Sequence, residues 1–239
     1  MDQRHKLVDL LAATVFFASL LGIFATRVVA DLPQFSARIN KGPVANPAIR
    51  EASGLVASRK NPGVLWTHND SGNPNRLYAL DSQGRTLGTY SLHTARSGIP
   101  NRDWEDIAIG PGPEEGQHYL YIGDIGDNQR AFASKFVYRV PEPNVDVGQT
   151  AIDTALVIST KLTLRYPDGA KDAETLMVDP RTKDIYIVSK EGSNAGVYRA
   201  AYPQSSQEPI TLERVTTLGL SVVVAGDISP QGDEVLLKT

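Results

Sequence analysis

A plan that recurs along the chain constrains the fold more than any other feature of the sequence. A carboxylate lies just ahead of a short apolar run, and after a turn a second apolar run ends in polar residues. The acids that open the four copies are Glu51, Glu105, Glu174 and Asp227, at intervals of roughly 50 to 70 residues. A loose repeat of this length is typical of a supersecondary unit that is stacked several times within one domain.

The second copy shows the plan most fully. Its acidic cluster lies in residues 101–110, and the following run over 119–128 ends in a second acidic cluster. Antiparallel pairing of two consecutive strands places the start of the first and the end of the second at the same end of the sheet. We therefore expect both clusters to meet at one end of the domain, and we place the function there.

Alternating apolar residues between turn signals predict four short strands in each copy. They are expected at 51–57, 63–69, 76–81 and 86–92, then at 104–109, 118–123, 135–140 and 155–166, then at 174–178, 184–189, 196–200 and 212–220. The fourth copy begins at 226, and no convincing amphipathic helix follows residue 30. Repeated four-stranded antiparallel units favour an all-β fold, a β-propeller, over a sandwich. We expect residues 31–239 to form one propeller domain with about four blades, truncated at its C-terminus.

Residues 1–30 differ from the rest of the chain. Arg4 and Lys6 precede an apolar run over 10–25, and small residues at 28–30 precede Asp31. This pattern is typical of a secretory signal peptide. The alternative is an uncleaved anchor, since the run is at the short edge of what spans a bilayer. In both cases we expect a secreted or periplasmic protein that meets a membrane only through an uncleaved N-terminus.

Composition narrows the classes of function. The chain has 239 residues, of which 41% are hydrophobic and 21% charged, as in a globular protein. The net charge is −3, and no stripe of Lys and Arg offers a positive surface to phosphate groups. We therefore expect no nucleic-acid partner. There is no cysteine, and an exported chain must then be held by core packing or by a metal. We expect a monomer.

The acidic residues at the expected end of the domain predict a metal site. Carboxylates held close together repel each other, so either their pKa values rise or a cation neutralises them. Oxygen ligands suit a hard cation, and calcium is favoured ahead of magnesium. The predicted ligands are Glu51, Glu105, Glu174, Asp227, Asp70, Asp124, Asp127 and Asn128, beside His68 and Lys190. The alternative is that Asp and Asn gather in β-turns for backbone reasons, which applies most to Asp70, Asp127 and Asn128.

The sequence motifs of other common metal sites and catalytic sites are absent. The four histidines show no paired spacing, which argues against a transition-metal site, and residues 123–128 do not match an EF-hand loop. No Gly-x-Ser-x-Gly elbow or phosphate-cradling glycine loop is present. Trp66 and Trp104 are expected in the core or a wall of the domain.

Four segments resemble the signature segments of a group of exported bacterial β-propeller proteins of largely unknown function. They are residues 103–108, 121–128, 138–143 and 172–174. The group is similar, more distantly, to phytase-like and other calcium-binding six-bladed propellers. The resemblance covers about residues 51–239 and implies a ring of blades with a cation at its channel. In calcium-dependent propeller phosphatases, clustered acids hold metal ions that bind phosphate and position a water. Here no full phosphatase motif is matched, and only Arg130 and Lys190 are well placed for phosphate.

Two functions follow from these observations. The first is an exported calcium-binding propeller whose acidic end supports metal-assisted hydrolysis of a phosphate or carboxyl ester, or binds a small ligand. Its catalytic candidates are Glu105, Asp124, Arg130 and Lys190. The second is a non-catalytic platform with a structural metal, whose loops contact a protein or an envelope polymer. Fold alone cannot separate the two. An enzyme needs an open metal position in a cleft with a basic group within reach.

Overall fold

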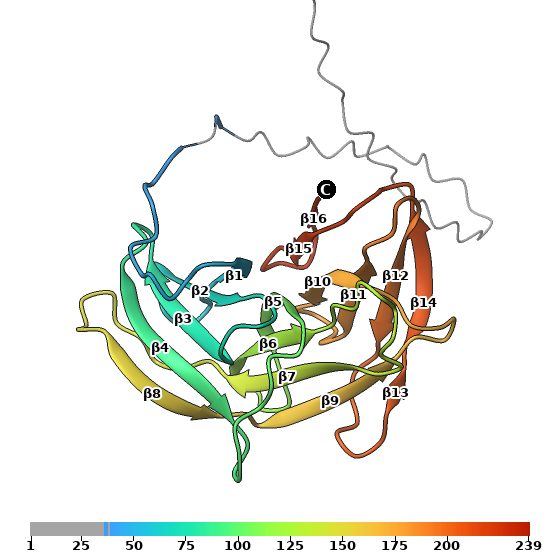
Figure 1. Cartoon of the computed structure of the whole chain (residues 1–239), viewed down its shortest axis with the longest axis horizontal. Helices are drawn as coiled ribbons and strands as arrows, with labels where there is room; N and C mark the ends of the chain where they lie inside the picture. Colours follow the sequence, from blue (N-terminus) through green and yellow to red (C-terminus); the bar gives the residue numbers. More distant parts are fainter. Residues whose placement is uncertain (1–35, 38) are drawn as a thin grey trace, which may run out of the picture. The chain divides into compact units, whose positions relative to one another are not determined.

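The computed structural model describes residues 36–37 and 39–239, in which all regular structure is β-strand (Figure 1). The expected all-β class is confirmed for these residues. No helix among them is long and apolar enough to span a bilayer. The predicted signal peptide, residues 1–30, lies outside the described part of the chain.

The first sheet contains the four strands that the turn signals predict. They are β1 (Ala52–Ala57), β2 (Val64–Asn69), β3 (Arg76–Asp81) and β4 (Thr86–His93), each antiparallel to the next. Gly63 and Gly84 have φ values of 81° and 78° in the turns, a region that residues with a side chain rarely adopt. These glycines explain why the strand boundaries were predictable here.

The next sheets repeat the antiparallel order. The second contains β5 (Trp104–Pro111), β6 (His118–Asp124), β7 (Lys135–Pro141) and β9 (Thr160–Arg165). The third contains β10 (Ala173–Val178), β11 (Ile185–Ser189), β12 (Ala195–Ala200) and β14 (Glu213–Leu218). A hairpin of β15 (Ala225–Ile228) and β16 (Val235–Lys238) forms a fourth, two-stranded sheet.

The prediction of a single strand over 155–166 was wrong. Residues in this span belong to two strands, because β8 (Ile152–Val157) pairs in parallel with β4 of the first sheet before the chain enters β9. The switch occurs where the N–H of Ile158 donates to His93 at 2.8 Å and the N–H of Ser159 donates to Arg139 at 2.9 Å. A second short strand, β13 (Ile210–Thr211), pairs in parallel with β9. The first two sheets are therefore five-stranded and not four-stranded.

The first strands of successive sheets pack against one another. β1 contacts β5, β5 contacts β10, and β10 contacts β15 (Figure 1). Large apolar side chains fill the space between neighbouring sheets, and Trp66 and Trp104 lie fully buried between the first and second, which confirms their core role. Consecutive antiparallel sheets with their first strands together form a propeller-type arrangement. It brings the starts of β1, β5 and β10 to one end of the domain.

Candidate functional site

A β-bulge at the same place in consecutive sheets positions two glutamates. The pairing of β5 with β6 shifts register between Trp104 and Asp106, and the pairing of β10 with β11 shifts between Ala173 and Thr175. The extra residues are Glu105 and Glu174, since a bulge opposes two residues to one on the partner strand and re-aims a side chain. These glutamates therefore occupy equivalent positions.

Glu51 and Asp227 are not equivalent to Glu105, contrary to the alignment of the four acids in the sequence. The position of Glu51 matches Asp103 and Asp172, because the carbonyl of each accepts an N–H from just beyond the second strand of its sheet. The donors and distances are Asp70 to Glu51 at 2.9 Å, Gly126 to Asp103 at 3.2 Å and Lys190 to Asp172 at 2.9 Å. Asp227 instead matches Asp106, since each accepts the N–H of the following isoleucine.

Three carboxylates from the first and second sheets converge. Oxygen atoms of Asp70, Asp103 and Glu105 all lie within 4.8 Å of one another. Gly126 makes room for them, because a Cβ at this position would lie 2.4 Å from Oε1 of Glu105 and 2.5 Å from Oδ2 of Asp103. Asp70 follows β2, whereas Asp103 and Glu105 flank the start of β5, so the cluster links two sheets.

Burial and neighbouring negative charges raise the pKa values of Glu105 and Asp103 in this cluster. The Glu105 residue is 6% exposed, and burial raises its pKa to about 9, with the charges of Asp70, Glu174, Asp103 and Asp172 adding to the effect. Burial also raises the pKa of Asp103, helped by Asp70 and Asp172. Among the described residues, no hydrogen bond or ion pair reaches the Glu105 carboxylate. Without a cation, this group is a neutral acid at pH 7.

The equivalent glutamate of the third sheet has its own cation. Nζ of Lys190 donates a hydrogen bond to the carboxylate of Glu174, and this bond raises the pKa of Lys190. In the second sheet the residue that corresponds to Lys190 by its backbone hydrogen bond is Gly126. On this side Glu105 therefore has the carboxylate of Asp103 as a neighbour, where Glu174 has an ammonium group.

Two other predicted ligands are buried in ion pairs of the second sheet. Asp124 accepts a hydrogen bond from Nε of Arg102 at 3.0 Å. Asp127 pairs at 2.8 Å with Lys135, and both side chains are about 1% exposed. Burial acts to raise the pKa of Asp127, but hydrogen bonds from Lys135 and two backbone N–H groups outweigh it and lower the pKa. Neither aspartate has an oxygen in the three-carboxylate group.

The remaining predicted residues lie on the surface. Glu51 is exposed and accepts a hydrogen bond from Asn73 at 2.7 Å, and Asn128 is exposed. Asp227 is exposed, with Arg59 at 3.9 Å. Arg130 pairs with Glu191 at 2.7 Å. The structure thus brings Glu105 and Asp70 together and leaves Glu51, Asp227 and Asn128 outside the cluster.

His68, which the sequence placed beside the predicted ligands, is a core residue. The residue is fully buried, and its ring lies edge-on to Trp104 with 5.8 Å between the ring centroids. Nδ1 lies 2.9 Å from the carbonyl of Asn69, and burial lowers the pKa of the imidazole. The imidazole is therefore a core side chain, and its Nε2 has no hydrogen-bond partner among the described residues.

Two acids at this site were not predicted from the sequence. Asp103 belongs to the cluster and Asp172 lies near it. Asp172 accepts the N–H of Asp127 at 2.8 Å and lies close enough to raise the pKa of Glu105. The signal was present, because Asp103-Trp104-Glu105 and Asp172-Ala173-Glu174 share the pattern Asp-x-Glu. Because the repeat was aligned on Glu105 and Glu174, the aspartates two residues before them were not included among the predicted ligands.

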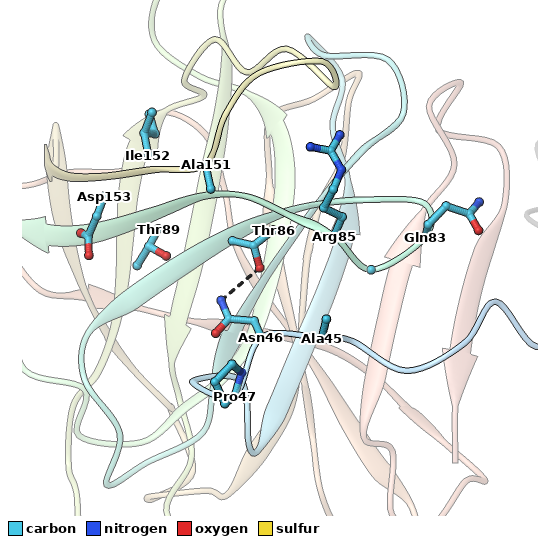
Figure 2. A pocket seen from close by; sticks show the side chains of 11 residues that line it. Ala45, Asn46, Pro47, Gln83, Arg85, Thr86, Thr89, Ala151, Ile152 and Asp153 are labelled. Carbon is cyan, nitrogen blue, oxygen red and sulfur yellow. Dashed lines mark hydrogen bonds between the residues drawn. The ribbon is translucent and has the colours of Figure 1, made fainter.

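Two hollows among the described residues lie elsewhere. A groove of about 580 Å³ is lined by Asn46, Thr86, Thr89 and Ile152 among others, at the outer part of the first sheet (Figure 2). Within it, Nδ2 of Asn46 donates to Oγ1 of Thr86 at 3.1 Å. A smaller cavity of about 240 Å³ is lined by Arg59, His118 and apolar residues at the ends of β5, β10 and β15. None of the three clustered carboxylates lines either hollow.

Comparison with known proteins gives low similarity. No protein-family model matches the chain, and no curated protein matches it. Among solved structures, it is similar to the β-propeller domain of Cps50 (Swd1) from Myceliophteria thermophila, with 10% identity and a TM-score of 0.41 over 75% of this chain and 47% of that one. The Dos1 propeller follows with 11% identity and a TM-score of 0.38 over 78% of this chain and 52% of that one.

A third similar structure is Kuenenia stuttgartiensis hydrazine synthase, with 9% identity, a TM-score of 0.40, and coverage of 78% of this chain and 71% of that one. The chain spans about half the length of the first two structures. Similarity at this level carries no argument about activity, so the propeller-type description depends on the sheets themselves. The resemblance to phytase-like propellers stays a prediction.

Proposed function

We propose that the protein is a calcium-binding propeller-type domain whose cation is held by Asp70, Asp103 and Glu105. The observation that carries the proposal is the contrast between two equivalent glutamates, of which Glu174 pairs with Lys190 whereas Glu105 has carboxylates and Gly126 around it. A cluster of buried and half-buried carboxylates that has no ion-pair partner among the described residues is stabilised by a proton or by a bound cation.

The donor set fits calcium. All three groups are carboxylates, and oxygens on opposite sides of one Ca²⁺ lie about 5 Å apart at its usual bond lengths, compared with the 4.8 Å limit of this cluster. Backbone carbonyls and water complete such sites in proteins. Magnesium is the second choice because it requires shorter bonds and stricter geometry.

A structural role or a binding role is favoured over hydrolysis. The basic residues expected to hold an anionic substrate are engaged, since Arg130 pairs with Glu191 and Lys190 pairs with Glu174. The two hollows described above are lined by other residues. The cation would join the first sheet to the second through Asp70, and the loops at this end would contact a protein, an envelope polymer or a small ligand. Export to the periplasm or beyond is part of the proposal and depends on residues 1–30.

Calorimetric titration and thermal unfolding of the full chain test the proposal. Saturating Ca²⁺ at about a hundredfold its Kd adds about 2.7 kcal/mol to the free energy of unfolding, or about 5–10 °C in Tm for a chain of this size. Glu105→Gln should abolish both the heat of binding and the shift. Glu51→Gln is the matched control, because this exposed acid lies outside the cluster and its loss should preserve both. Equal responses of wild type and Glu105→Gln would remove the cation from this site.

A further inference from the structure

The cavity of about 240 Å³ lies at the opposite end of β5 from the three clustered carboxylates. Glu105 is at the start of β5, whereas Ile109 and Pro111 at the end of this strand line the cavity, together with residues at the ends of β10 and β15. These first strands pack on one another, β5 on β10 and β10 on β15. The cavity is therefore formed between first strands and does not depend on what covers the outer edge of any sheet.

A short sequence pattern that recurs three times supplies the apolar lining. An aliphatic residue lies two positions before a proline at the end of three first strands, and these six residues line the cavity. The three copies are Ile109-Gly110-Pro111, Val178-Asp179-Pro180 and Ile228-Ser229-Pro230. Gly110 lets the first two copies approach closely, because a Cβ at this position would lie 2.5 Å from Cγ1 of Val178.

In the first sheet, Arg59 stands at the position that proline occupies in the third and fourth sheets. Backbone hydrogen bonds define the equivalence. The N–H of the preceding residue donates at 2.9 Å to a carbonyl at, or just before, the start of the next strand, and the donors are Ser58, Asp179 and Ser229. The turn therefore does not require an arginine, and the repeat places one cation beside an otherwise apolar lining.

The hydrogen-bonding groups of Arg59 and His118 in this cavity are unused. The guanidinium of Arg59 makes no hydrogen bond among the described residues, and Oδ2 of Asp227 lies 3.9 Å from its Nη2, beyond hydrogen-bond distance. The Arg59 side chain is only 22% exposed. Nδ1 of His118 is buried and likewise has no partner in the described part of the chain. No carboxylate is among the described residues that line the cavity.

We propose that this cavity binds a small monocarboxylate with an aliphatic body. The guanidinium of Arg59 can bind both oxygens of a carboxylate through two parallel hydrogen bonds, and His118 can donate another. Ile109, Val178 and Ile228 would contact the hydrocarbon part. A single guanidinium in an apolar lining suits one negative charge better than the charge of a phosphate. The volume is below that of sites for drug-sized ligands, so the ligand has only a few carbon atoms.

Ligand-observed NMR titration of the full chain tests the proposal. The solution contains chelator, so the result is independent of the proposed cation site. The probe is 4-methylpentanoate, and 4-methylpentanamide and acetate are the comparison ligands. We expect both to bind at least about tenfold more weakly, because the amide lacks the charge and acetate lacks the aliphatic body. Equal affinity for the acid and either comparison ligand would overturn the proposal.

Two variants of Arg59 test its role. Arg59→Gln should weaken binding of 4-methylpentanoate by about tenfold or more, since it removes the charge. Arg59→Pro should abolish binding and still fold, because Pro180 and Pro230 occupy the equivalent positions and the N–H of Arg59 makes no hydrogen bond among the described residues. Thermal unfolding checks the fold of each variant, and Arg59→Gln decides the question if Arg59→Pro does not fold.

Arg181→Gln is the matched control, because this exposed arginine follows Pro180 and does not line the cavity. It should bind the acid like wild type. The proposal is overturned if wild type does not bind the acid, if Arg59→Gln binds it as tightly as wild type, or if Arg181→Gln loses as much affinity as Arg59→Gln. A wild type that does not bind, together with equal losses of stability in Arg59→Gln and Asp227→Asn, would identify Arg59 as an ion-pair residue between the first and fourth sheets.

Discussion

A carboxyl oxygen of Asp106 accepts the backbone N–H of Leu176 at 2.8 Å, which joins the second sheet to the third next to the acidic cluster. The other oxygen accepts the N–H of Ile107 at 2.9 Å. Burial raises the pKa of this group to about 8 despite these two hydrogen bonds. The role of Asp106 is therefore to provide two acceptor oxygens for buried N–H groups, and not to carry a negative charge. Gly54 of the first sheet packs against the same group, since a Cβ there would lie 2.8 Å from Asp106 Oδ1.

Asp106→Ala should lower the free energy of unfolding by about 3 kcal/mol, because it leaves two buried N–H groups without acceptors. Urea denaturation measures the change. Thr175→Val is the matched control in the third sheet, since Oγ1 of Thr175 is buried and has no partner among the described residues. That control should be neutral or slightly stabilising. A loss in Thr175→Val as large as in Asp106→Ala would refute the acceptor role.

A second carboxylate connects the first and second sheets. Glu142 is 1% exposed, and its oxygens accept hydrogen bonds from the N–H of Lys60 at 3.1 Å, from Nδ2 of Asn61 at 3.3 Å and from Nε1 of Trp66 at 3.0 Å. Oγ of Ser58 donates to the same group. Glu142→Ala should therefore destabilise the protein by about 3 kcal/mol or more. Glu114→Ala, in the exposed turn between β5 and β6, should change stability by less than about 0.5 kcal/mol. Equal midpoints for both variants in urea would contradict this role.

The pH dependence of stability reports on the cluster. Burial raises the pKa of Glu105 from 4.5 to about 9, so between these values the folded protein holds a proton that the unfolded chain has released. In chelator, stability should therefore fall as pH rises from about 5 to 9. Glu105→Gln should reduce the slope, and the part due to Asp106, whose pKa is about 8, should remain.

Calcium should oppose that fall. Binding to ionised carboxylates releases the proton, so the stabilisation by Ca²⁺ should grow with pH. Thermal unfolding at fixed Ca²⁺ and in chelator, at pH values from 5 to 9, measures both effects. Equal slopes of stability against pH in chelator for wild type and Glu105→Gln would show that Glu105 is ionised in the folded protein without a metal.

Sequence reasoning succeeded where local rules decide the outcome. Alternation and turn glycines such as Gly63 and Gly84 set the strands of the first sheet, and antiparallel pairing placed Asp70 and Glu105 at one end of the domain. It failed where tertiary pairing decides. No local signal shows that residues 152–157 leave their own sheet for β4, because an exposed edge strand has the same alternation in either place.

The site illustrates the same limit. The bulge at Glu105 changes which acids are equivalent, and a one-residue insertion is not visible in a loose repeat. For this reason Glu51 and Asp227 were aligned with Glu105, whereas the structure pairs their positions with Asp103 and Asp106. Ion pairs also cannot be assigned from the sequence, since Asp124 and Asp127 meet Arg102 and Lys135 only after folding.

Exchanging the residues at the two equivalent positions should exchange the properties of the two glutamates. Gly126→Lys would place an ammonium group beside Glu105, as Lys190 lies beside Glu174. Compared with Gly126→Ala, it should abolish the thermal shift with Ca²⁺ and stabilise the chelated protein. Gly126→Ala is the control for crowding, because its Cβ displaces the flexible carboxylate ends without adding charge.

The reverse change is Lys190→Gln, which removes the partner of Glu174. It leaves that carboxylate near Asp172 and Glu105, since the charges of all three act on Lys190 in the native protein. Calorimetry should then show a second, weaker Ca²⁺ per chain, because a cation would take the place of the ammonium group. Unchanged stoichiometry in Lys190→Gln, together with a Ca²⁺ response in Gly126→Lys equal to that of Gly126→Ala, would show that the lysine and the metal do not occupy equivalent places.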